Sequence, residues 1–435
     1  MSFSVPTGVV SFEEARRTVQ EHAARVRSGV AQAGTIETLD LLAARGRVLA
    51  ESLVADRDFP PFPRATRDGY AVRAVDVANV PAPLNVIGQI KAGDPGEQFN
   101  LAPGQAVSIM TGAPLPAGAD AVVMVEYTTS SGMIVEVQRG VKSGENFVPR
   151  AAEARTGQVL VSPGQRLDHS LIAIAASVGK SQVQVFRKPQ IAVLSTGDEV
   201  VEVGVTPGPA QIRNSNSYSL AAQIEEAGAE AVRLAIAPDE PRRLHDLIEE
   251  GLQCDLLLLT GGVSMGKYDL VEQVLGELGA EFYFTGAKIQ PGKPVVFGSC
   301  SCSADTPLRV PTADKLLRRT HGPAPQYFFG LPGNPVSTMV TFQLFAHPMI
   351  DALSGARPEP LVFLRARLKT DVRAKIGLTR FLPAIMSGQF EDSQVELAAW
   401  QGSGDTAALA RSNCYLVVPP DREMIPAGEF VSVLA

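Results

Sequence analysis

Residues 254–266 read Cys-Asp-Leu-Leu-Leu-Leu-Thr-Gly-Gly-Val-Ser-Met-Gly, an apolar run that stops abruptly in small and hydroxyl residues. This pattern is typical of a buried strand that opens onto a ligand-binding loop. The glycines let the backbone approach a ligand, Thr260 and Ser264 supply hydroxyls, and a following helix offers free N–H groups to an anion. Two interpretations stay open: a phosphate or nucleotide cradle, or a tight strand-to-helix turn that needs glycine only for its dihedral angles.

The sequence around this stretch alternates between strand and helix patterns. The predicted strands are residues 191–194, 231–236 and 255–259, and the predicted helices are residues 217–227, 241–252 and 270–278. Because helical crossovers join successive strands, the strands are expected to be parallel and covered on both faces. The sequence therefore predicts a doubly wound α/β domain over residues 188–355. The polar residues 299–326 are interpreted as an exposed excursion between two of its strands.

Loops at the carboxyl ends of these strands are the expected ligand site, as in other open parallel sheets. The loops, which are rich in Gly, Pro, Ser, Thr or acidic residues, are 195–199, 260–269, 291–294 and 330–335. Asp198, Glu199 and Asp269 would gather carboxylates where a phosphate is expected, which favours a magnesium ion between them. The alternative is that Asp198 and Asp269 only cap helices. Lys293, on a stiff loop, is either an anion ligand or a solvated surface lysine.

The flanking regions predict a discontinuous domain with an insertion. A helix is expected to begin at Ser11, since Ser11 and Glu14 match a capping box, and helical character returns at residues 169–177. Short alternating runs between these helices, rich in Val, Pro and Gly, predict a small β domain. The expected flanking units are a mainly helical domain of residues 1–58 and 149–187, an inserted β domain of residues 59–148, and an all-β C-terminal domain of residues 356–435.

Composition and charge argue against several classes of protein. With 435 residues, 45% of them hydrophobic, the chain is expected to form several domains. No long apolar run and no signal-type N-terminus are present, which predicts a soluble cytoplasmic protein without membrane contact. The net charge of −7, without a basic block, makes nucleic-acid binding unexpected. The scattered four cysteines and five histidines predict neither a disulfide framework nor a zinc site.

Six short motifs follow one another along the chain. They are residues 67–72 (Arg-Asp-Gly-Tyr-Ala-Val), 110–116 (Met-Thr-Gly-Ala-Pro-Leu-Pro), 195–199, 261–266 with Asp269, 291–294 (Pro-Gly-Lys-Pro) and 331–337. In this order they resemble the MoeA-type molybdopterin molybdenumtransferases, the family that includes the E domain of gephyrin. The resemblance covers nearly the whole chain. It implies that the central α/β domain is of the molybdopterin-binding type.

The resemblance also implies an activity in molybdenum cofactor biosynthesis. Members of the family are elongated homodimers of four-domain subunits with a shared active site. They insert molybdate into adenylylated molybdopterin, with magnesium-dependent hydrolysis of the adenylate and release of AMP. A molybdopterin adenylyltransferase that delivers the adenylate is a candidate partner.

Carried over by motif, the catalytic roles fall to Asp68, Thr111, Glu199, Asp269 and Lys293. Glu199 and Asp269 would bind magnesium, and Lys293 would face the oxyanion. Asp68 and Thr111 would reach the cleft from the partner subunit. The residues expected to bind the pterin, phosphate or oxyanion are Ser195, Thr196, Gly197, Asp198, Gly261, Gly262, Ser264, Gly266, Pro332, Asn334, Pro335, Ser337 and Ser403.

Four places depart from the family's pattern. The segment Arg150-Ala151-Ala152-Glu153 stands where Arg-Gly-Glu-Asp is common. Asn214 replaces an aspartate, and a neutral amide is a weaker magnesium ligand. Gln290 stands where many members have lysine, and Leu378 stands where an arginine is expected, with Arg380 close by instead.

Three functions are therefore compared. The favoured one is the molybdate-inserting enzyme. The second is a scaffold that binds pterin without turnover, which Asn214 and Leu378 would favour. The third is a molybdopterin adenylyltransferase, which would consume ATP in the presence of pterin alone.

Overall fold

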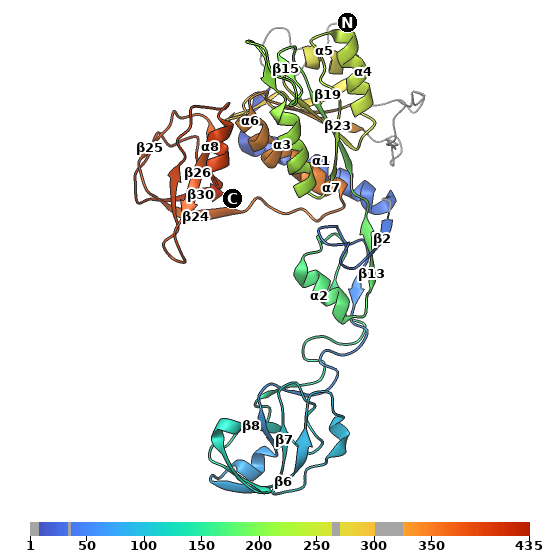
Figure 1. Ribbon diagram of the computed structural model, residues 1–435, viewed down its shortest axis with the longest axis vertical. Helices are drawn as coiled ribbons and strands as arrows, with labels where there is room; N and C mark the ends of the chain where they lie inside the picture. Colours follow the sequence, from blue (N-terminus) through green and yellow to red (C-terminus); the bar gives the residue numbers. More distant parts are fainter. Residues whose placement is uncertain (1–7, 34–35, 263–269, 301–324) are drawn as a thin grey trace.

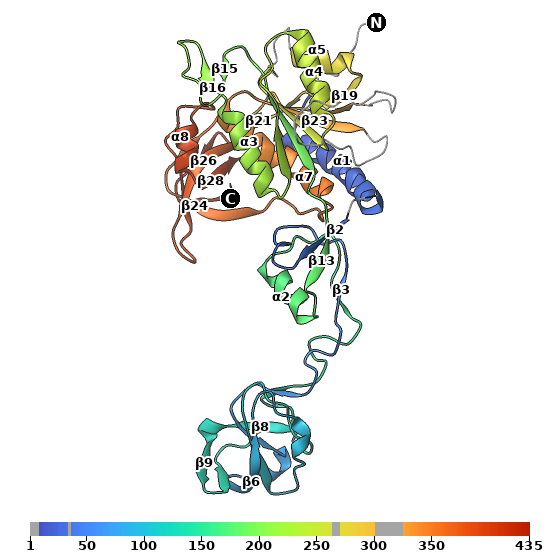
Figure 2. The same cartoon turned by 45° about the vertical axis from the view of Figure 1, so that its right-hand side comes forward.

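The computed structural model describes residues 8–33, 36–262, 270–300 and 325–435 and shows an elongated molecule. The central and C-terminal parts lie together at one end, the β insertion lies at the other, and a small unit connects them (Figure 1). The rotated view in Figure 2 shows the same order. Within the described ranges, no helix combines the length and the apolarity needed to cross a membrane.

The central sheet has six strands. They are β14 (Gln190–Ser195), β17 (Glu230–Arg233), β18 (Leu256–Thr260), β19 (Ala280–Phe284), β22 (Val296–Cys300) and β23 (Gln326–Leu331). Their order is β17-β14-β18-β23-β22-β19, and the first four are parallel, as the sequence predicts. β22 and β19 run antiparallel to their neighbours, so the prediction of a purely parallel sheet is wrong at this edge. Residues 285–295, which join β19 to β22, contain no helix, and antiparallel neighbours need no helical crossover.

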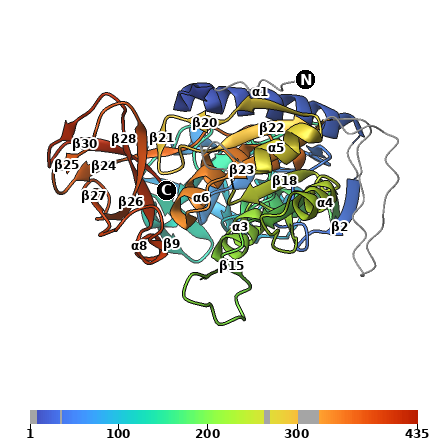
Figure 3. The ribbon, with the colours of Figure 1, turned by 90° about the horizontal axis from the view of Figure 1, so that it is seen from above.

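Helices cover both faces of the central sheet (Figure 3). They are α1 (Phe12–Ala33), α3 (Ser215–Glu226), α4 (Pro241–Gly251), α5 (Leu270–Glu277), α6 (Pro335–Thr341) and α7 (His347–Leu353). Successive residues of a strand point to opposite faces. Ile191 and Val193 of β14 therefore pack in one core with α1, α3, α6 and α7, while Ala192 and Leu194 pack in a second core with α4 and α5. Each fully buried aliphatic side chain contributes roughly 1.5–3 kcal/mol.

The start of α1 confirms the predicted capping box. The hydroxyl of Ser11 accepts from the Glu14 N–H at 3.1 Å, and the Ser11 N–H donates to the Glu14 carboxylate at 2.8 Å. These bonds hold the pKa of Glu14 below its usual value. Phe12, Ala15 and Val19 then join the core of the central sheet. The N-terminal helix is thus packed against the α/β domain, and the domain limits expected from the sequence stay a prediction.

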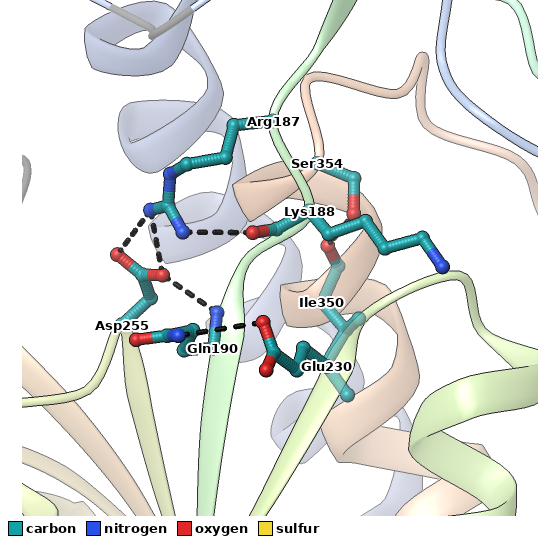
Figure 4. Close-up of polar contacts among 7 residues, drawn as sticks. All are labelled: Arg187, Lys188, Gln190, Glu230, Asp255, Ile350 and Ser354. Atoms are coloured by element: carbon teal, nitrogen blue, oxygen red, sulfur yellow. Dashed lines mark hydrogen bonds and ion pairs between the residues drawn. The ribbon is translucent and has the colours of Figure 1, made fainter. Parts of the chain in front are cut away.

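The amino ends of three parallel strands are tied together by Asp255, which directly precedes β18 (Figure 4). Its two carboxylate oxygens accept from Arg187 Nη2 at 2.8 and 3.1 Å. One of them also accepts from the Gln190 N–H at 2.7 Å. The Gln190 side chain donates in turn to Glu230 at 3.3 Å, at the start of β17. This tie lies at the edge of the sheet opposite the expected ligand loops, so it fixes the strands without occupying the site.

The connecting unit lies between the central sheet and the insertion (Figure 1). It contains α2 (His169–Ser177), as predicted, and two small antiparallel sheets. Their strands are β2 (Ile36–Asp40) with β13 (Gln182–Phe186), and β3 (Leu53–Val54) with β12 (Val159–Val161). Strands and helix share one apolar core. This unit is therefore mixed rather than mainly helical in the part of the chain that the structure describes.

The insertion is a small β domain, as predicted. Its sheet has the order β8-β5-β7-β6-β10-β9, with β5 (Gly69–Val72), β6 (Ala82–Ile90), β7 (Gln105–Ile109), β8 (Ala121–Met124), β9 (Thr128–Ser131) and β10 (Ile134–Val137). Apolar side chains form a core on each face of this sheet. The insertion thus has cores of its own, apart from that of the central sheet.

The C-terminal domain is a small closed barrel. Its strands are β24 (Phe363–Leu368), β26 (Thr379–Ser387), β27 (Gln394–Leu397), β28 (Cys414–Val418) and β30 (Phe430–Leu434). β26 closes it by pairing with both β27 and β28. β21 (Ile289–Gln290) of the central domain also pairs with β26, so the two domains share a strand junction. The all-β prediction misses one short helix, α8 (Thr406–Arg411), which Asp405 caps.

Candidate functional site

Three parallel strands end at the same level on the carboxyl side of the central sheet. Ser195 of β14 is the register partner of Thr260 of β18, and Thr260 is the partner of Leu331 of β23. The Thr196 N–H donates to the Thr260 carbonyl at 3.0 Å, which continues the ladder by one residue. Three of the predicted ligand loops therefore leave the sheet side by side, as expected at this edge.

The loop after β14 folds back on itself at Gly197. This glycine has a φ of 128°, and a Cβ atom there would lie 2.5 Å from Glu199 Oε2, so the missing side chain leaves room for that carboxylate. Glu199 is exposed. Asp198 Oδ1 accepts from the Asp239 N–H at 3.1 Å. Asp198 therefore binds the loop before α4 and caps no helix directly.

The turn after β18 packs against Thr196. Gly261 and Gly262 have φ values of 89° and 63°, and Cβ atoms there would lie within 2.6–3.1 Å of Thr196 atoms. Glycine is needed here both for its dihedral angles and for close approach. Thr196 is only 4% exposed, and its Oγ1 has no hydrogen-bond partner among the described residues. Buried hydroxyls of this kind are rare unless a ligand or water bonds them.

Asn216, which the sequence prediction missed, joins two of the loops. From the first turn of α3, its Nδ2 donates to Thr260 Oγ1 at 2.9 Å and to the Gly333 carbonyl at 2.7 Å. Its Oδ1 is buried and has no partner in the part of the chain described here. The only sequence signal was a second asparagine two residues after the helix-capping Asn214. A side chain that bridges distant loops leaves no local pattern.

The loop after β23 leads into α6, with Pro335 in its first turn as expected. The hydroxyls of Thr260 and Thr338 both donate to the Pro332 carbonyl. Asn334 Nδ2 donates to Ser403 Oγ at 2.9 Å, and the Val336 N–H donates to the Ser403 carbonyl at 3.0 Å. The predicted residue Ser403 of the C-terminal domain is thus brought to this loop. Ser337 is buried in α6.

The Pro291–Pro294 loop packs against the same helix. Gly292 has a φ of 104°, and a Cβ there would clash with Thr341 of α6. Lys293, the next residue, is exposed and forms no ion pair within the described residues. Its carbonyl accepts from the Ala287 N–H at 3.0 Å, which closes the loop at its base. The loop therefore presents a cation without an ion pair among the described residues beside α6, the helix that follows the loop after β23.

Three predicted residues, Ser264, Gly266 and Asp269, lie outside the described residues. Of the two expected magnesium ligands, the structure places only Glu199. Its exposed carboxylate has no lysine or arginine partner in the described ranges, which suits a residue that would bind a hard cation. One carboxylate is a suitable oxygen ligand for magnesium, and the ion stays a proposal.

Comparison with known proteins matches the chain from end to end. The profile of the MoeA N-terminal region, domains I and II, matches residues 10–179, a probable molybdopterin-binding domain matches residues 192–352, and the MoeA C-terminal region, domain IV, matches residues 365–435. A molybdopterin molybdenumtransferase of a Nostoc strain is 36% identical over 92% of this chain and 88% of its own length. The chain belongs to the molybdopterin molybdenumtransferase (MoeA) family. This is a family of transferases in molybdenum cofactor biosynthesis.

Further relatives agree in sequence and in fold. Molybdopterin molybdenumtransferase 1 of Mycobacterium tuberculosis is 32% identical over 96% of this chain and 98% of its own length. The crystal structure of the molybdopterin biosynthesis MoeA protein of Pyrococcus horikoshii is 27% identical, covers 98% of this chain and 100% of its own, and has a TM-score of 0.72. The four-part architecture described above is thus the fold of this family.

The structure shows the surroundings of two departures from the MoeA pattern. Asn214 is 3% exposed, and its Oδ1 accepts from Ser195 Oγ at 2.9 Å and from the Ser217 N–H at 3.2 Å, so it caps α3. Ala151, where the family commonly has glycine, has a φ of 61°. In the same segment Glu153 pairs with Arg64 and Arg150 pairs with Asp58. The segment is built into the connection between the insertion and the rest of the chain.

Asp68 and Thr111 form a pair in the insertion. Asp68 Oδ1 accepts from the Thr111 N–H at 2.6 Å, and both residues are exposed. This bond, with the Thr111 side chain, holds the pKa of Asp68 below its usual value. Asp68 directly precedes β5 and Thr111 lies two residues after β7, and this β domain lies at the opposite end of the molecule from the central sheet (Figure 1). Within one chain the structure therefore does not bring Asp68 or Thr111 to the loops that follow β14, β18 and β23.

Proposed function

We propose that the protein inserts molybdate into adenylylated molybdopterin and hydrolyses the adenylate with magnesium, releasing AMP. The observation that carries this proposal is the meeting of three loops above the ends of β14, β18 and β23. There Thr196 Oγ1 and Asn216 Oδ1 are buried without a partner among the described residues. A buried polar atom without a hydrogen-bond partner lowers the stability of the fold unless a ligand bonds it. Membership of the family supports the choice of ligand.

In this proposal, different residues of these loops bind different parts of the ligand. The carboxyl edge of the sheet holds the pterin and the phosphate, whereas Lys293 and Ser403 face the molybdate. The residues assigned to the pterin and phosphate are Ser195, Thr196, Gly197, Asp198, Gly261, Gly262, Ser264, Gly266, Pro332, Asn334, Pro335 and Ser337. We add Asn216 to this group because it holds two of the loops together.

The chemical step is hydrolysis of a phosphorus–oxygen bond, and the site stabilises the charge that develops as this bond breaks. Glu199 and Asp269 would hold magnesium, which neutralises negative charge on the phosphate as that bond breaks. A water oxygen bonds to the adenylate phosphorus, the bond from this phosphorus to the molybdopterin phosphate oxygen breaks, and a proton passes to solvent. Asp68 or Asp269 would position the water. The bond from Thr111 holds the pKa of Asp68 below its ordinary value, and the carboxylate is ionised at neutral pH in any case.

The active site in this proposal is shared between two copies of the chain. Asp68 and Thr111 stand at the far end of the molecule from Glu199, so they serve the partner's loops rather than their own (Figure 1). The exposed apolar side chains of Met110 and Val125, which adjoin Thr111 and Asp68, are consistent with a surface that another subunit covers. Delivery of the adenylate by a molybdopterin adenylyltransferase and a cytoplasmic location remain part of the proposal.

An assay of AMP release tests the proposal. Purified protein with adenylylated molybdopterin is expected to release AMP only when both molybdate and magnesium are present. Tight pterin binding with no release under these conditions would instead support the scaffold. Consumption of ATP with molybdopterin alone would support the adenylyltransferase.

A further inference from the structure

An ion pair holds the connecting unit against the central domain. Arg166, which lies between β12 and α2, donates through Nη2 to Asp351 Oδ1 of α7 at 2.7 Å. Its Nη1 donates to the carbonyl of Gly46, in its own unit, at 2.9 Å. Helix α7 lies on the side of the central domain that faces the connecting unit in both Figure 1 and Figure 2. The guanidinium is therefore held by one unit while it binds the other.

Both ends of this interdomain pair, Arg166 and Asp351, belong to packed elements. Met349 and Ile350, which precede Asp351 in α7, are buried in the core of the central sheet. Leu167, which follows Arg166, is buried in the core of the connecting unit. Packed cores deform little, so a bond between two of them constrains the orientation of one unit relative to the other.

The apolar contact at this junction is small. Its core among the described residues consists of Val30, Val48, Phe186 and Ala356. The Arg357 N–H, after α7, also donates to the Gly164 carbonyl at 2.8 Å. Both side chains of the interdomain pair are partly exposed, so the pair is expected to add little to stability, but its hydrogen bonds are directional. Hydrogen bonds therefore contribute much of what fixes the angle between the two units.

The orientation of the connecting unit determines where the insertion lies. The insertion has cores of its own and is joined to the rest of the chain through this unit (Figure 1). In the proposed function its residues Asp68 and Thr111 act on the loops of a partner subunit. A rotation at the junction displaces them by an amount that grows with their distance from it, and a misplacement of about 1 Å can lower a rate about 100-fold.

We propose that the interdomain pair positions the insertion for catalysis. Arg166, through Asp351, sets the angle of the arm formed by the connecting unit and the insertion, and so places Asp68 and Thr111 at the partner's loops. The inference rests on the proposed function, in which the site is shared between subunits. The competing explanation is that the pair only stabilises the fold. Steady-state kinetics and a distance measurement separate these two roles.

The kinetics of AMP release give the first test. Arg166→Gln is expected to lower kcat about 10- to 100-fold and to leave KM for adenylylated molybdopterin within about twofold, because the loops of the central sheet are unchanged. Arg166→Lys keeps the charge and is expected to lose less. Asp351→Asn should reproduce the loss, and the double variant should lose no more than either single variant. The matched control is Lys180→Gln, which breaks the 2.6 Å ion pair with Glu51 inside the connecting unit and should keep kcat.

Pulsed electron paramagnetic resonance measures the distance between the two units directly. Spin labels are attached to Ser170→Cys of α2 and Asp246→Cys of α4, both at exposed positions. The three cysteines within the described residues are buried, and the fourth is removed by Cys302→Ser. A hybrid dimer with both labels in one subunit avoids distances between subunits. We expect a narrow distance distribution for the unmodified pair and a broader one for Arg166→Gln.

Two glycine variants test the same contact with every charge retained. Gly228, just after α3, has a φ of 81°, and a Cβ atom there would lie 2.2 Å from Arg166 Nη1. Gly228→Ala should therefore displace the guanidinium and broaden the distance distribution. The matched control is Gly279→Ala, because Gly279 has a similar φ of 74° but nothing lies within 4 Å of its Cβ position. This control should leave the distribution narrow.

An Arg166→Gln variant that melts earlier but keeps the unmodified kcat and distances would overturn the inference. A fall in kcat without a broader distribution, a broader distribution without a fall in kcat, or equal broadening by Gly228→Ala and Gly279→Ala would do the same. If the unmodified protein releases no AMP, the proposed function is rejected, and the distances alone decide whether the interdomain pair sets the angle of the arm.

Discussion

The central domain and the β insertion present their candidate catalytic residues in different ways. Above the central sheet, the side chains of Asn216, Thr260 and Asn334 form hydrogen bonds between loops. Buried polar atoms there have no hydrogen-bond partner among the described residues. In the insertion, which lies at the far end of the molecule, the Asp68 carboxylate accepts from the Thr111 N–H, and both residues are exposed. The comparison teaches that hydrogen bonds between loops hold one group of candidate residues together, whereas the other group is exposed and, in the proposed function, acts on a second subunit.

The tie at the amino edge of the sheet gives the largest expected stability effect. Asp255→Ala leaves Arg187 without this carboxylate in a partly buried position and frees the starts of β14 and β17. Breaking such a pair costs about 3–5 kcal/mol in the free energy of unfolding. Urea unfolding followed by circular dichroism measures it, with the exposed Asp246→Ala on α4 as the matched control. Equal urea midpoints for the two variants would show that the stability of the central sheet does not depend on this tie.

The buried hydroxyl of Thr196 predicts opposite signs for stability and binding. Thr196→Val removes a hydroxyl that bonds nothing among the described residues, so the melting temperature should stay or rise, while pterin affinity falls about tenfold. The matched control is Thr338→Val, whose hydroxyl donates to the carbonyls of Pro332 and Asn334. It should lower the stability by about 1–2 kcal/mol. If Thr196→Val destabilises the protein as much as Thr338→Val, the hydroxyl has a structural partner.

The connection to the insertion contains a strained alanine. Ala151 has a φ of 61°, a conformation that costs residues other than glycine roughly 1–2 kcal/mol. Ala151→Gly should therefore raise the free energy of unfolding by about 0.5–1 kcal/mol after the loss of backbone entropy. The neighbouring Ala152→Gly is the control and should lower it slightly. A lower melting temperature for Ala151→Gly would contradict the left-handed backbone at this position.

The smallest expected effect is a shift in the titration of Asp68. The bond from Thr111 places its pKa below the ordinary value of 3.8. The stabilisation that this bond provides is complete above pH 3.8 and is lost as the pH falls through the lowered pKa. Carbon NMR of labelled aspartates, assigned with Asp68→Asn, measures the midpoint. A midpoint at or above 3.8 would show that the carboxylate does not hold Thr111.

The sequence predicts the central architecture well because its signals are local. The apolar run at residues 256–259 and the helix patterns that follow depend on periodicity, and the strands and helices lie within a few residues of the expected bounds. The antiparallel edge formed by β19 and β22 could not be predicted, because an apolar run records burial and not strand direction. The packing of α1 on the central sheet likewise depends on distant residues.

The candidate site was predictable only where a motif names it. The loops that hold Glu199 and Gly261 follow parallel strands, so topology places them at one edge, whereas the loop that holds Lys293 precedes the antiparallel β22. Asn216 escaped prediction because it acts across elements far apart in the sequence. The separation of Asp68 from the loops of the central sheet depends on the shape of the whole molecule, which no local pattern contains.

One measurement tests the shared site most directly. Asp68→Asn and Glu199→Gln are each expected to lower the rate of AMP release by about 100-fold or more, whereas two controls, the half-buried Asp94→Asn and the exposed Glu202→Gln, keep it. Co-expression with two different tags isolates hybrid dimers that contain one subunit of each variant. A site shared between subunits leaves one of two sites intact, so the hybrid should show about half of the unmodified rate. A hybrid as inactive as its parents, or no hybrid at all, would contradict the account.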